Sequence, residues 1–503
     1  MKRLYDFAIA AALLFCAACA PKEPVVPARC ERLAEKPSIY PDYADVAVPC
    51  NIAPLTFRVN GDGDDFVTRF TAPGKTVLCG GSEVSVPAEE WRSLLENAAG
   101  GKVDVEVFSN VGGKWLGYAP FSIFVSPDSI DRYISYRLIP PSYVAYENLT
   151  IAQRDLTTFE ESTIYNNRLV SSEPDGQCIN CHAYKNWKTD NMQFHVRQFL
   201  GGTVFVHNGK AKKVNMKTDS TISAGVYPSF NPKYDIVAYS VNNTGQIFHT
   251  RNSNKVEVQD QASDIIVYNP QTETVAHVAN VPNSLEVFPA WSPDGRTLYY
   301  CSAHFPHRDN SKVRTDDLVL GYKDVKYDVL SRSWDPVSGE FGAVDTVFAA
   351  SAMGKSATFP RISPDGRYML FALAEYGCFH IWHKDADLYL LELSTGKMWP
   401  LEKANSEFPE SYHAWSSSGR WILFASRRED TNYSRLYIAH INADGTSDKA
   451  FLLPQPQSSF YDFFDRSYNV PEFMVEPVKI TPHEFVEVVK GPAVNVKYST
   501  NIK

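Results

Sequence analysis

The chain has 503 residues, of which 44% are hydrophobic and 21% charged, so it is too long for one ordinary core and too polar for a multi-span membrane protein. Aromatic residues make up 13%, and the 27 glycines and 32 prolines favour many short strands joined by turns. The formal net charge is −9 and there is no long run of Lys or Arg, which argues against a nucleic-acid partner.

The first residues are typical of an export signal. Lys2 and Arg3 precede a short apolar run that closes on Cys-Ala-Ala-Cys, ending at Cys19. The two small residues before Cys19 resemble a bacterial lipobox, which implies a signal peptide over 1–18 and a lipid on Cys19. An ordinary cleaved signal and an uncleaved anchor remain alternatives. Residues 19–34 are rich in proline and predict a tether. With the lipid on Cys19, we expect an outer-membrane lipoprotein that faces the periplasm or the cell surface.

Export permits disulfides, so the remaining cysteines matter. Apart from the two in the motif described below, they are Cys30, Cys50, Cys79, Cys301 and Cys378. Five is an odd number, so at least one thiol stays free, and Cys50 with Cys79 is a plausible pair. Cys301 lies in an apolar run and is expected to be a small buried side chain.

Residues 35–160 alternate apolar and polar side chains in short runs separated by turn residues. Such runs occur at 55–59, 103–107 and 121–125, and the period of two predicts half-buried antiparallel strands. Apolar residues recur at helical spacing in 88–99, which predicts one short helix. We therefore expect a β-sandwich-like domain with a structural or binding role.

The segment 161–190 holds the sharpest chemical signal, a Cys-x-x-Cys-His motif formed by Cys178, Cys181 and His182. This spacing suits one covalent haem c: the two thiols add to the vinyl groups, and the adjacent imidazole becomes the proximal iron ligand. A zinc site is disfavoured because no second Cys pair exists. A redox-active Cys-x-x-Cys pair and a plain structural disulfide remain alternatives.

A haem iron takes a sixth ligand, and Met192 and His195 are the candidates that follow the motif. If 192–197 is a strand, these two side chains point to opposite faces, so only one of them can face the haem. Met192 is also explained as a core residue and His195 as a polar surface residue. His380 and His383 form a weaker candidate metal pair, because exposed loop histidines are commoner than ligands.

From residue 220 onward the chain repeats an aromatic residue, usually followed by proline, and then a Ser-Pro-Asp-Gly-type turn and an apolar strand. Proline fixes φ and glycine allows positive φ, so each copy predicts the hairpin of one blade. The copies resemble the WD40-like repeats of TolB-type β-propellers, which implies a propeller over 191–480, five or six blades with degenerate terminal ones, and a tail over 481–503. The four copies begin at Tyr227, Phe288, Phe359 and Tyr412.

Together these features are similar to a family of exported Gram-negative lipoproteins that combine a β-sandwich, a Cys-x-x-Cys-His segment and a TolB-like propeller. The resemblance implies haem binding and an envelope location but no defined reaction. The first hypothesis is a membrane-tethered monohaem c-type cytochrome that transfers electrons, with the all-β propeller as a docking platform for an unknown redox partner. The alternative is a non-redox propeller lipoprotein that binds an envelope protein or a glycan. An oxidoreductase with an open haem site is the third.

Overall fold

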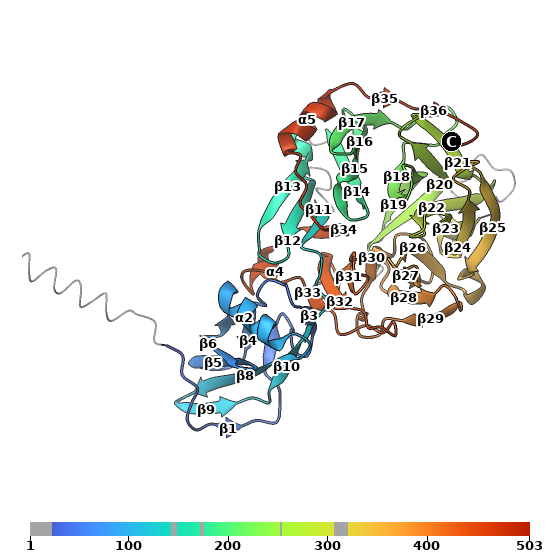
Figure 1. The fold of residues 1–503 in the computed structure, drawn as a ribbon. Helices are drawn as coiled ribbons and strands as arrows, with labels where there is room; N and C mark the ends of the chain where they lie inside the picture. The colour runs from blue at the N-terminus through green and yellow to red at the C-terminus, as the bar shows by residue number, and fades with distance from the viewer. Residues whose placement is uncertain (1–22, 142–147, 172–175, 252–253, 306–319, 503) are drawn as a thin grey trace, which may run out of the picture.

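The computed structural model describes residues 23–141, 148–171, 176–251, 254–305 and 320–502. The predicted signal peptide and the lipidated Cys19 lie outside these residues. The described chain is all-β: an N-terminal domain (blue) lies below a ring of sheets that runs from cyan to red (Figure 1). None of the helices in the described part is long and apolar enough to span a bilayer.

The N-terminal domain pairs a larger sheet with a smaller one. Phe57 of the smaller sheet packs against Phe70 and Phe121 of the larger sheet, with 6.3 Å between ring centroids in both pairs. Helix α2 (Ala88–Ala98) buries Trp91 and Leu94 against this core, so the predicted helix is confirmed. The larger sheet contains β1 (Glu31–Arg32), β3 (Ala47–Pro49), β5 (Asp65–Ala72), β6 (Lys75–Gly80), β8 (Lys102–Val111), β9 (Lys114–Gly117) and β10 (Phe121–Ser126), and the smaller contains β2 (Ser38–Tyr40), β4 (Phe57–Asn60) and β7 (Glu83–Val84).

The described residues form six blades of a β-propeller. Blades 1 to 3 are built from β34 (Ser467–Met474), β11 (Tyr133–Ile139), β12 (Thr150–Asp155) and β13 (Glu161–Asn166); from β14 (Gln177–Lys185), β15 (Lys188–Gln198), β16 (Gly202–His207) and β17 (Lys210–Asn215); and from β18 (Val226–Phe230), β19 (Val237–Phe248), β20 (Val256–Asn269) and β21 (Thr274–Ala279). Blades 4 to 6 are built from β22 (Ser284–Trp291), β23 (Thr297–His304), β24 (Asp328–Trp334) and β25 (Phe341–Phe348); from β26 (Ser356–Ile362), β27 (Tyr368–Ala374), β28 (Asp387–Glu392) and β29 (Lys397–Pro400); and from β30 (Glu410–Trp415), β31 (Trp421–Ser426), β32 (Arg435–His440) and β33 (Phe451–Leu452).

Blade 1 closes the ring because it is made from both ends of the propeller segment. The late strand β34 pairs antiparallel with the early strand β11, from Tyr133–Met474 to Ile139–Ser467. The predicted boundary at residue 160 is therefore corrected. Residues 133–166 supply three strands of blade 1, and the N-terminal domain ends near Ile130.

The innermost strand of every described blade carries the same irregularity. A β-bulge interrupts its pairing, and a residue with left-handed backbone stands in the bulge. Such a conformation costs a non-glycine residue about 1–2 kcal/mol, so six copies at matching places mark a built feature. These residues, with φ between 46° and 56°, are Cys181, Tyr227, Phe288, Phe359, Tyr412 and Val470.

The predicted tail over 481–503 is part of the propeller surface. Helix α5 (Pro482–Lys490) starts with a capping box at Thr481 and Glu484, and its buried Phe485 packs on Phe194 of blade 2. After the helix, β35 (Val494–Asn495) and β36 (Lys497–Tyr498) extend the outer edges of blades 2 and 3 by parallel pairing with β17 and β21. The tail therefore covers strand edges that would otherwise be open.

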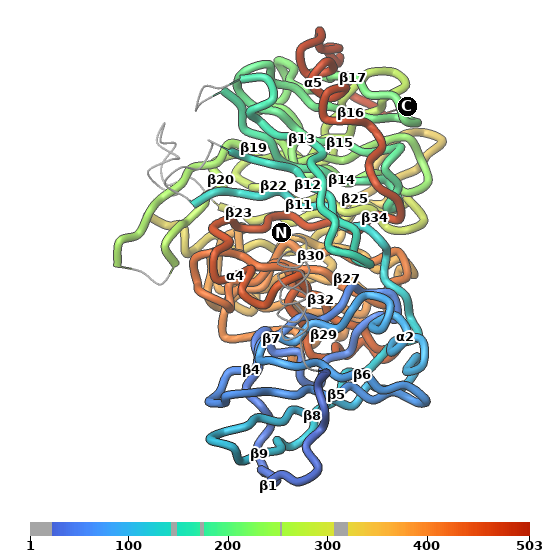
Figure 2. Tube along the Cα trace, turned by 90° about the vertical axis from the view of Figure 1, so that its left-hand side faces the viewer, coloured from blue at the N-terminus to red at the C-terminus, as the bar shows by residue number. Residues whose placement is uncertain are grey.

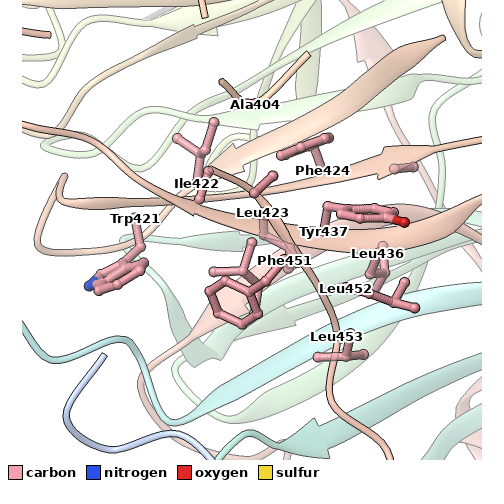
Figure 3. Close-up of a cluster of buried hydrophobic side chains, with 14 of the residues drawn as sticks. Ala404, Trp421, Ile422, Leu423, Phe424, Leu436, Tyr437, Phe451, Leu452 and Leu453 are labelled. Carbon is pink, nitrogen blue, oxygen red and sulfur yellow. The ribbon is translucent and has the colours of Figure 1, made fainter. Parts of the chain in front are cut away.

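The N-terminal domain docks on blade 6, as the side view in Figure 2 shows. Blade 6 has a dense apolar core that includes Ile422, Phe424 and Phe451 (Figure 3). At the edge of blade 6 the indole nitrogen of Trp421 donates to the carbonyl oxygen of Asp128 at 3.1 Å. Asp462 of the short helix α4 (Phe460–Phe463) forms an ion pair with Arg58 of the N-terminal domain. The docking surface lies on the outer side of one blade and leaves the propeller axis clear.

Candidate functional site

The Cys-x-x-Cys-His motif is the innermost strand of blade 2. Cys181 occupies the left-handed bulge position that an aromatic residue fills in the four repeats found from sequence. The run Cys181-His182-Ala183-Tyr184 corresponds to Tyr412-His413-Ala414-Trp415 of blade 6. In the other four blades proline follows the bulge residue, so His182 and His413 both replace a repeat proline. The motif is thus a copy of the propeller repeat, which corrects the prediction of a separate haem segment over 161–190.

The three motif residues point into different surroundings. Cys178 lines a cavity on the propeller axis. Cys181 is 3% exposed, and burial raises the pKa of its thiol, an effect that Arg197 and a backbone hydrogen bond from Tyr227 partly oppose. His182 is 1% exposed, and burial lowers its pKa to about 3, partly opposed by the backbone of Ser135. Neither ring nitrogen of His182 has a partner in hydrogen-bonding geometry.

This arrangement does not fit a covalent haem c. Attachment requires two thiols and the proximal imidazole to face one space large enough for the macrocycle. Cys178 faces a cavity on the propeller axis. Cys181 and His182 line neither that cavity nor a second cavity at the opposite face of the propeller. Cys181 lies against the backbone of Tyr227 in blade 3, and His182 lies against the backbone of Ser135 in blade 1.

The two candidate distal ligands also have other roles. The predicted alternation along 192–197 is confirmed. Strand β15 buries Met192, Phe194 and Val196 in the apolar core between blades 1 and 2, whereas His195 and Arg197 point to the other face. His195 lies within hydrogen-bonding distance of Thr203, with Nδ1 3.1 Å from Oγ1. Burial lowers the pKa of His195 to about 3. Both residues are explained by packing inside blade 2.

The remaining predictions for cysteine and histidine have mixed outcomes. All seven described cysteines are free thiols, so the plausible pair of Cys50 and Cys79 is not formed, whereas the prediction that Cys301 is buried is confirmed. His380 and His383 are fully buried rather than exposed on a loop. His383 Nε2 lies 3.0 Å from a carboxylate oxygen of Glu257, and the described residues hold no cluster of His, Cys, Asp and Glu suited to a metal.

Aromatic side chains from four blades meet on the propeller axis. Phe288 and Phe359 stack with 3.8 Å between centroids, and Tyr227 and Tyr412 pack against them at 4.9 Å. Tyr227 also reaches Phe359, 5.9 Å away and two blades distant, which is possible only near the centre of the ring. Four of the six bulge residues therefore form an axial cluster, and two of them, Tyr227 and Tyr412, also line a cavity on the axis.

The larger cavity opens at the face where the innermost strands begin, and its volume is about 810 Å³. This size lies within the range of about 300–1,000 Å³ that is usual for ligand pockets. Tyr227, Tyr412 and Phe379 are on its axial side. Polar amides from blades 1, 2 and 3 line its wall, namely Asn180, Asn242, Gln246 and Asn469. We call this space the axial chamber.

Three arginines face the axial chamber from adjacent blades: Arg137 of blade 1, Arg197 of blade 2 and Arg427 of blade 6. Arg427 is 6% exposed, and its guanidinium carbon lies 3.6 Å from the ring centre of Trp382. Burial lowers the pKa of Arg427 to about 10, an effect that Asp430 partly opposes. The group still carries its charge at neutral pH.

The second cavity lies at the opposite face and has a volume of about 370 Å³. Residues of all six blades line it, mostly those that follow the bulge, such as Pro228, Ala290 and Ala414. Arg361 faces this cavity but is paired with Glu472 at 2.6 Å. Its single arginine is therefore already neutralised.

Sequence reasoning missed the residues of the axial chamber. Arg197 lies at the end of the predicted strand 192–197 without a motif of its own, and Arg137, Arg427 and Trp382 lie in no local motif either. The missed copy of the repeat did have a signal, because Ala183 recurs as Ala414 and both are followed by an aromatic residue. The chamber arginines leave no such signal in the sequence, because they belong to three different blades and come together only when the ring closes.

No family model and no curated protein sequence matches the chain. Among solved structures, an oligogalacturonate lyase in complex with manganese aligns with 82% of this chain and 99% of its own, at 13% identity and a TM-score of 0.29. An oligogalacturonate lyase from Vibrio parahaemolyticus aligns with 82% and 100% of the two chains, at 12% identity and a TM-score of 0.31. A prolyl endopeptidase structure covers 64% of this chain and 42% of its own, at 12% identity and a TM-score of 0.31. These TM-scores are too low to assign a fold, so the six-bladed propeller rests on the strand pairing within this chain.

Proposed function

We propose that this protein is a lipid-anchored envelope protein that binds a glycan in the axial chamber of its propeller. One observation carries the proposal: a cavity of about 810 Å³ on the axis whose wall combines aromatic rings with amide and guanidinium groups. Aromatic faces offer surface for the apolar faces of sugar rings, and amides bond hydroxyl groups. Lipidation at Cys19 and the envelope location belong to the proposal as expectations from the sequence.

The chamber is tested by isothermal titration calorimetry with a panel of neutral and acidic oligosaccharides of two to six units. Phe248 is suited to substitution because it lines the chamber yet is 62% exposed, so Phe248→Ala removes contact surface without opening the core. We expect this variant to bind the best oligosaccharide several-fold more weakly. Phe463→Ala is the matched control, since Phe463 is 84% exposed on α4, away from the chamber. Equal loss in both variants, or no binding by the parent protein, contradicts the proposal.

A monohaem cytochrome remains the other prediction from sequence. The directions of Cys178, Cys181 and His182 do not support it. Expression in a host with haem c maturation machinery, followed by an absorption spectrum and a denaturing gel stained for covalent haem, decides between the two. We expect no Soret band, and we expect a variant with serine at both cysteines to bind the glycan like the parent. Haem that survives denaturation would contradict this.

A further inference from the structure

The axial chamber presents positive charge that the described residues do not neutralise. Five cationic residues line it: Arg137, Arg197, Lys255, Lys384 and Arg427. No Asp or Glu is among its described lining residues, although the whole chain carries a net charge of −9. None of the three arginines forms an ion pair within the described part of the chain.

The arginines differ in how much of their hydrogen-bonding capacity the fold uses. Arg197 makes no hydrogen bond with a described residue, so its whole guanidinium is available. Arg137 donates to the carbonyl oxygen of Ile179 at 3.0 Å and to Asn469 at 2.8 Å, which fixes its position. Arg427 donates to the carbonyl oxygens of Thr431 and Asn432. The buried Nε atoms of Arg137 and Arg427 remain without a partner.

Other polar atoms around these arginines are also unsatisfied. Asn180 is nine-tenths buried, and its side-chain oxygen has no hydrogen-bond partner. The same is true of the side-chain nitrogen of Asn242. These atoms have less than 1 Å² of accessible surface each, so a ligand reaches them only if a side chain shifts. Among the three arginines, the partly exposed Arg197 is the one whose whole guanidinium the chamber presents to a ligand directly.

We infer that the ligand of the axial chamber is an acidic oligosaccharide whose carboxylates bind Arg197, Arg137 and Arg427. This inference rests on the proposed function and names its substrate class. The unbonded guanidinium fork of Arg197 matches a carboxylate in two parallel hydrogen bonds, which are about twice as strong as bonds between neutral groups. Arg137 and Arg427, which already donate to protein acceptors, add positive charge beside it. Tyr227, Tyr412 and Trp382 supply the flat surfaces for the sugar rings. A sugar with carboxylates uses both kinds of wall, whereas a neutral sugar leaves the charges buried and unpaired.

The test uses the purified full chain and hexamers of galacturonic acid, measured by calorimetry beside the same hexamers with their carboxylates methyl-esterified. We expect the acid to bind at least about 10-fold more tightly than the ester, and its affinity to fall as salt rises from 50 to 500 mM. Arg197→Met should weaken binding of the acid by about 10-fold or more and should change binding of the ester little. Because Arg197 makes no hydrogen bond within the described chain, its loss should not disturb the fold. Arg197→Lys should restore part of the loss.

The control variant is Arg296→Met, which removes the same charge from an exposed turn at the opposite face. It should bind the acid like the parent. Equal affinity for acid and ester would overturn the acidic ligand while leaving the glycan proposal standing. Absence of binding by acid, ester and neutral hexamers would overturn the proposed function itself. If poly-glutamate binds but no sugar does, the arginines bind carboxylates as inferred, and the inference that the ligand is an oligosaccharide is wrong.

Discussion

At the scale of the residue, two histidines show how a propeller repeat can imitate a cofactor motif. His413 replaces a repeat proline and places Nε2 2.7 Å from the carbonyl oxygen of Phe359. His182 replaces the same proline but finds no such partner. Four fully buried histidines, namely His182, His195, His380 and His413, have a pKa lowered to about 3, in each case chiefly by burial. They are therefore held neutral in the folded chain.

These groups predict a loss of stability in acid. Between pH 6.5 and about 3 the unfolded chain binds protons on these histidines that the folded chain does not, so the free energy of unfolding falls as the pH falls. Each contributes roughly 1 kcal/mol per pH unit below 6.5. We expect the midpoint of thermal unfolding to drop between pH 7.5 and 5.

His182→Pro tests the repeat and the acid sensitivity together. Proline occupies this position in four blades, so we expect the variant to fold, to bind ligand, and to lose less stability than the parent between pH 7.5 and 5. The measurement is thermal unfolding followed by circular dichroism at both pH values. His483→Gln, at an exposed position on α5, is the control and should follow the parent. Failure of His182→Pro to fold would contradict the assignment of β14 as a repeat copy.

At the scale of the element, the repeats were predictable wherever their side chains were ordinary. An aromatic residue, proline and a Ser-Pro-Asp-Gly turn identify blades 4 and 5, and altered copies of this pattern identify blades 3 and 6. The turns behave as expected, with Gly295, Gly366 and Gly419 at φ near 70°. Blades 1 and 2 are the degenerate terminal blades that the sequence predicts, but it does not predict their full strand sets. In blade 2 Cys181 replaces the aromatic residue, so β14 shows no repeat. In blade 1 the paired strands β11 and β34 lie more than 300 residues apart in the sequence, and no local pattern reports such a pairing. The chamber was missed for the same reason.

The closing strand β34 is predicted to decide whether the ring forms. A chain that ends after Arg466 loses the partner of β11, so the innermost edge of blade 1 opens and its buried Ile134 and Phe473 contact is lost. We expect no cooperative thermal transition and aggregation on size-exclusion chromatography. A chain that ends after Gly491 loses only the outer strands β35 and β36, so it should fold with a lowered midpoint. Similar behaviour of the two truncations would contradict this role.

At the scale of the whole molecule, the N-terminal domain and blade 6 share a polar junction at Asp128. Arg420 and His440 contact its carboxylate at 3.2 and 3.1 Å. Burial raises the pKa of Asp128, but the hydrogen bonds from His440 and Arg420 outweigh it and hold the pKa below its usual value. The carboxylate is about one-third exposed, so solvent screens these contacts. The junction orients the domain more than it stabilises it.

Asp128→Ala should weaken this junction by about 1 kcal/mol, because a partly exposed pair is screened. Differential scanning calorimetry is expected to show the N-terminal domain unfolding before the propeller, or a lower common midpoint. Ligand binding should be unchanged, since the junction lies on the outer side of blade 6. Asp62→Ala, in an exposed turn, is the control. A loss of affinity in Asp128→Ala would contradict the independence of junction and chamber.

The aromatic cluster at the centre of the ring has a consequence for long polymers. Phe288 and Phe359 stack across the axis and pack against Tyr227 and Tyr412, which line the chamber, so the cluster fills the axis on the inner side of the chamber. Under the proposed function, a polysaccharide would not be threaded through the ring, and binding is expected at chain ends. Each cut in a polymer would then add one more molecule that the protein can bind.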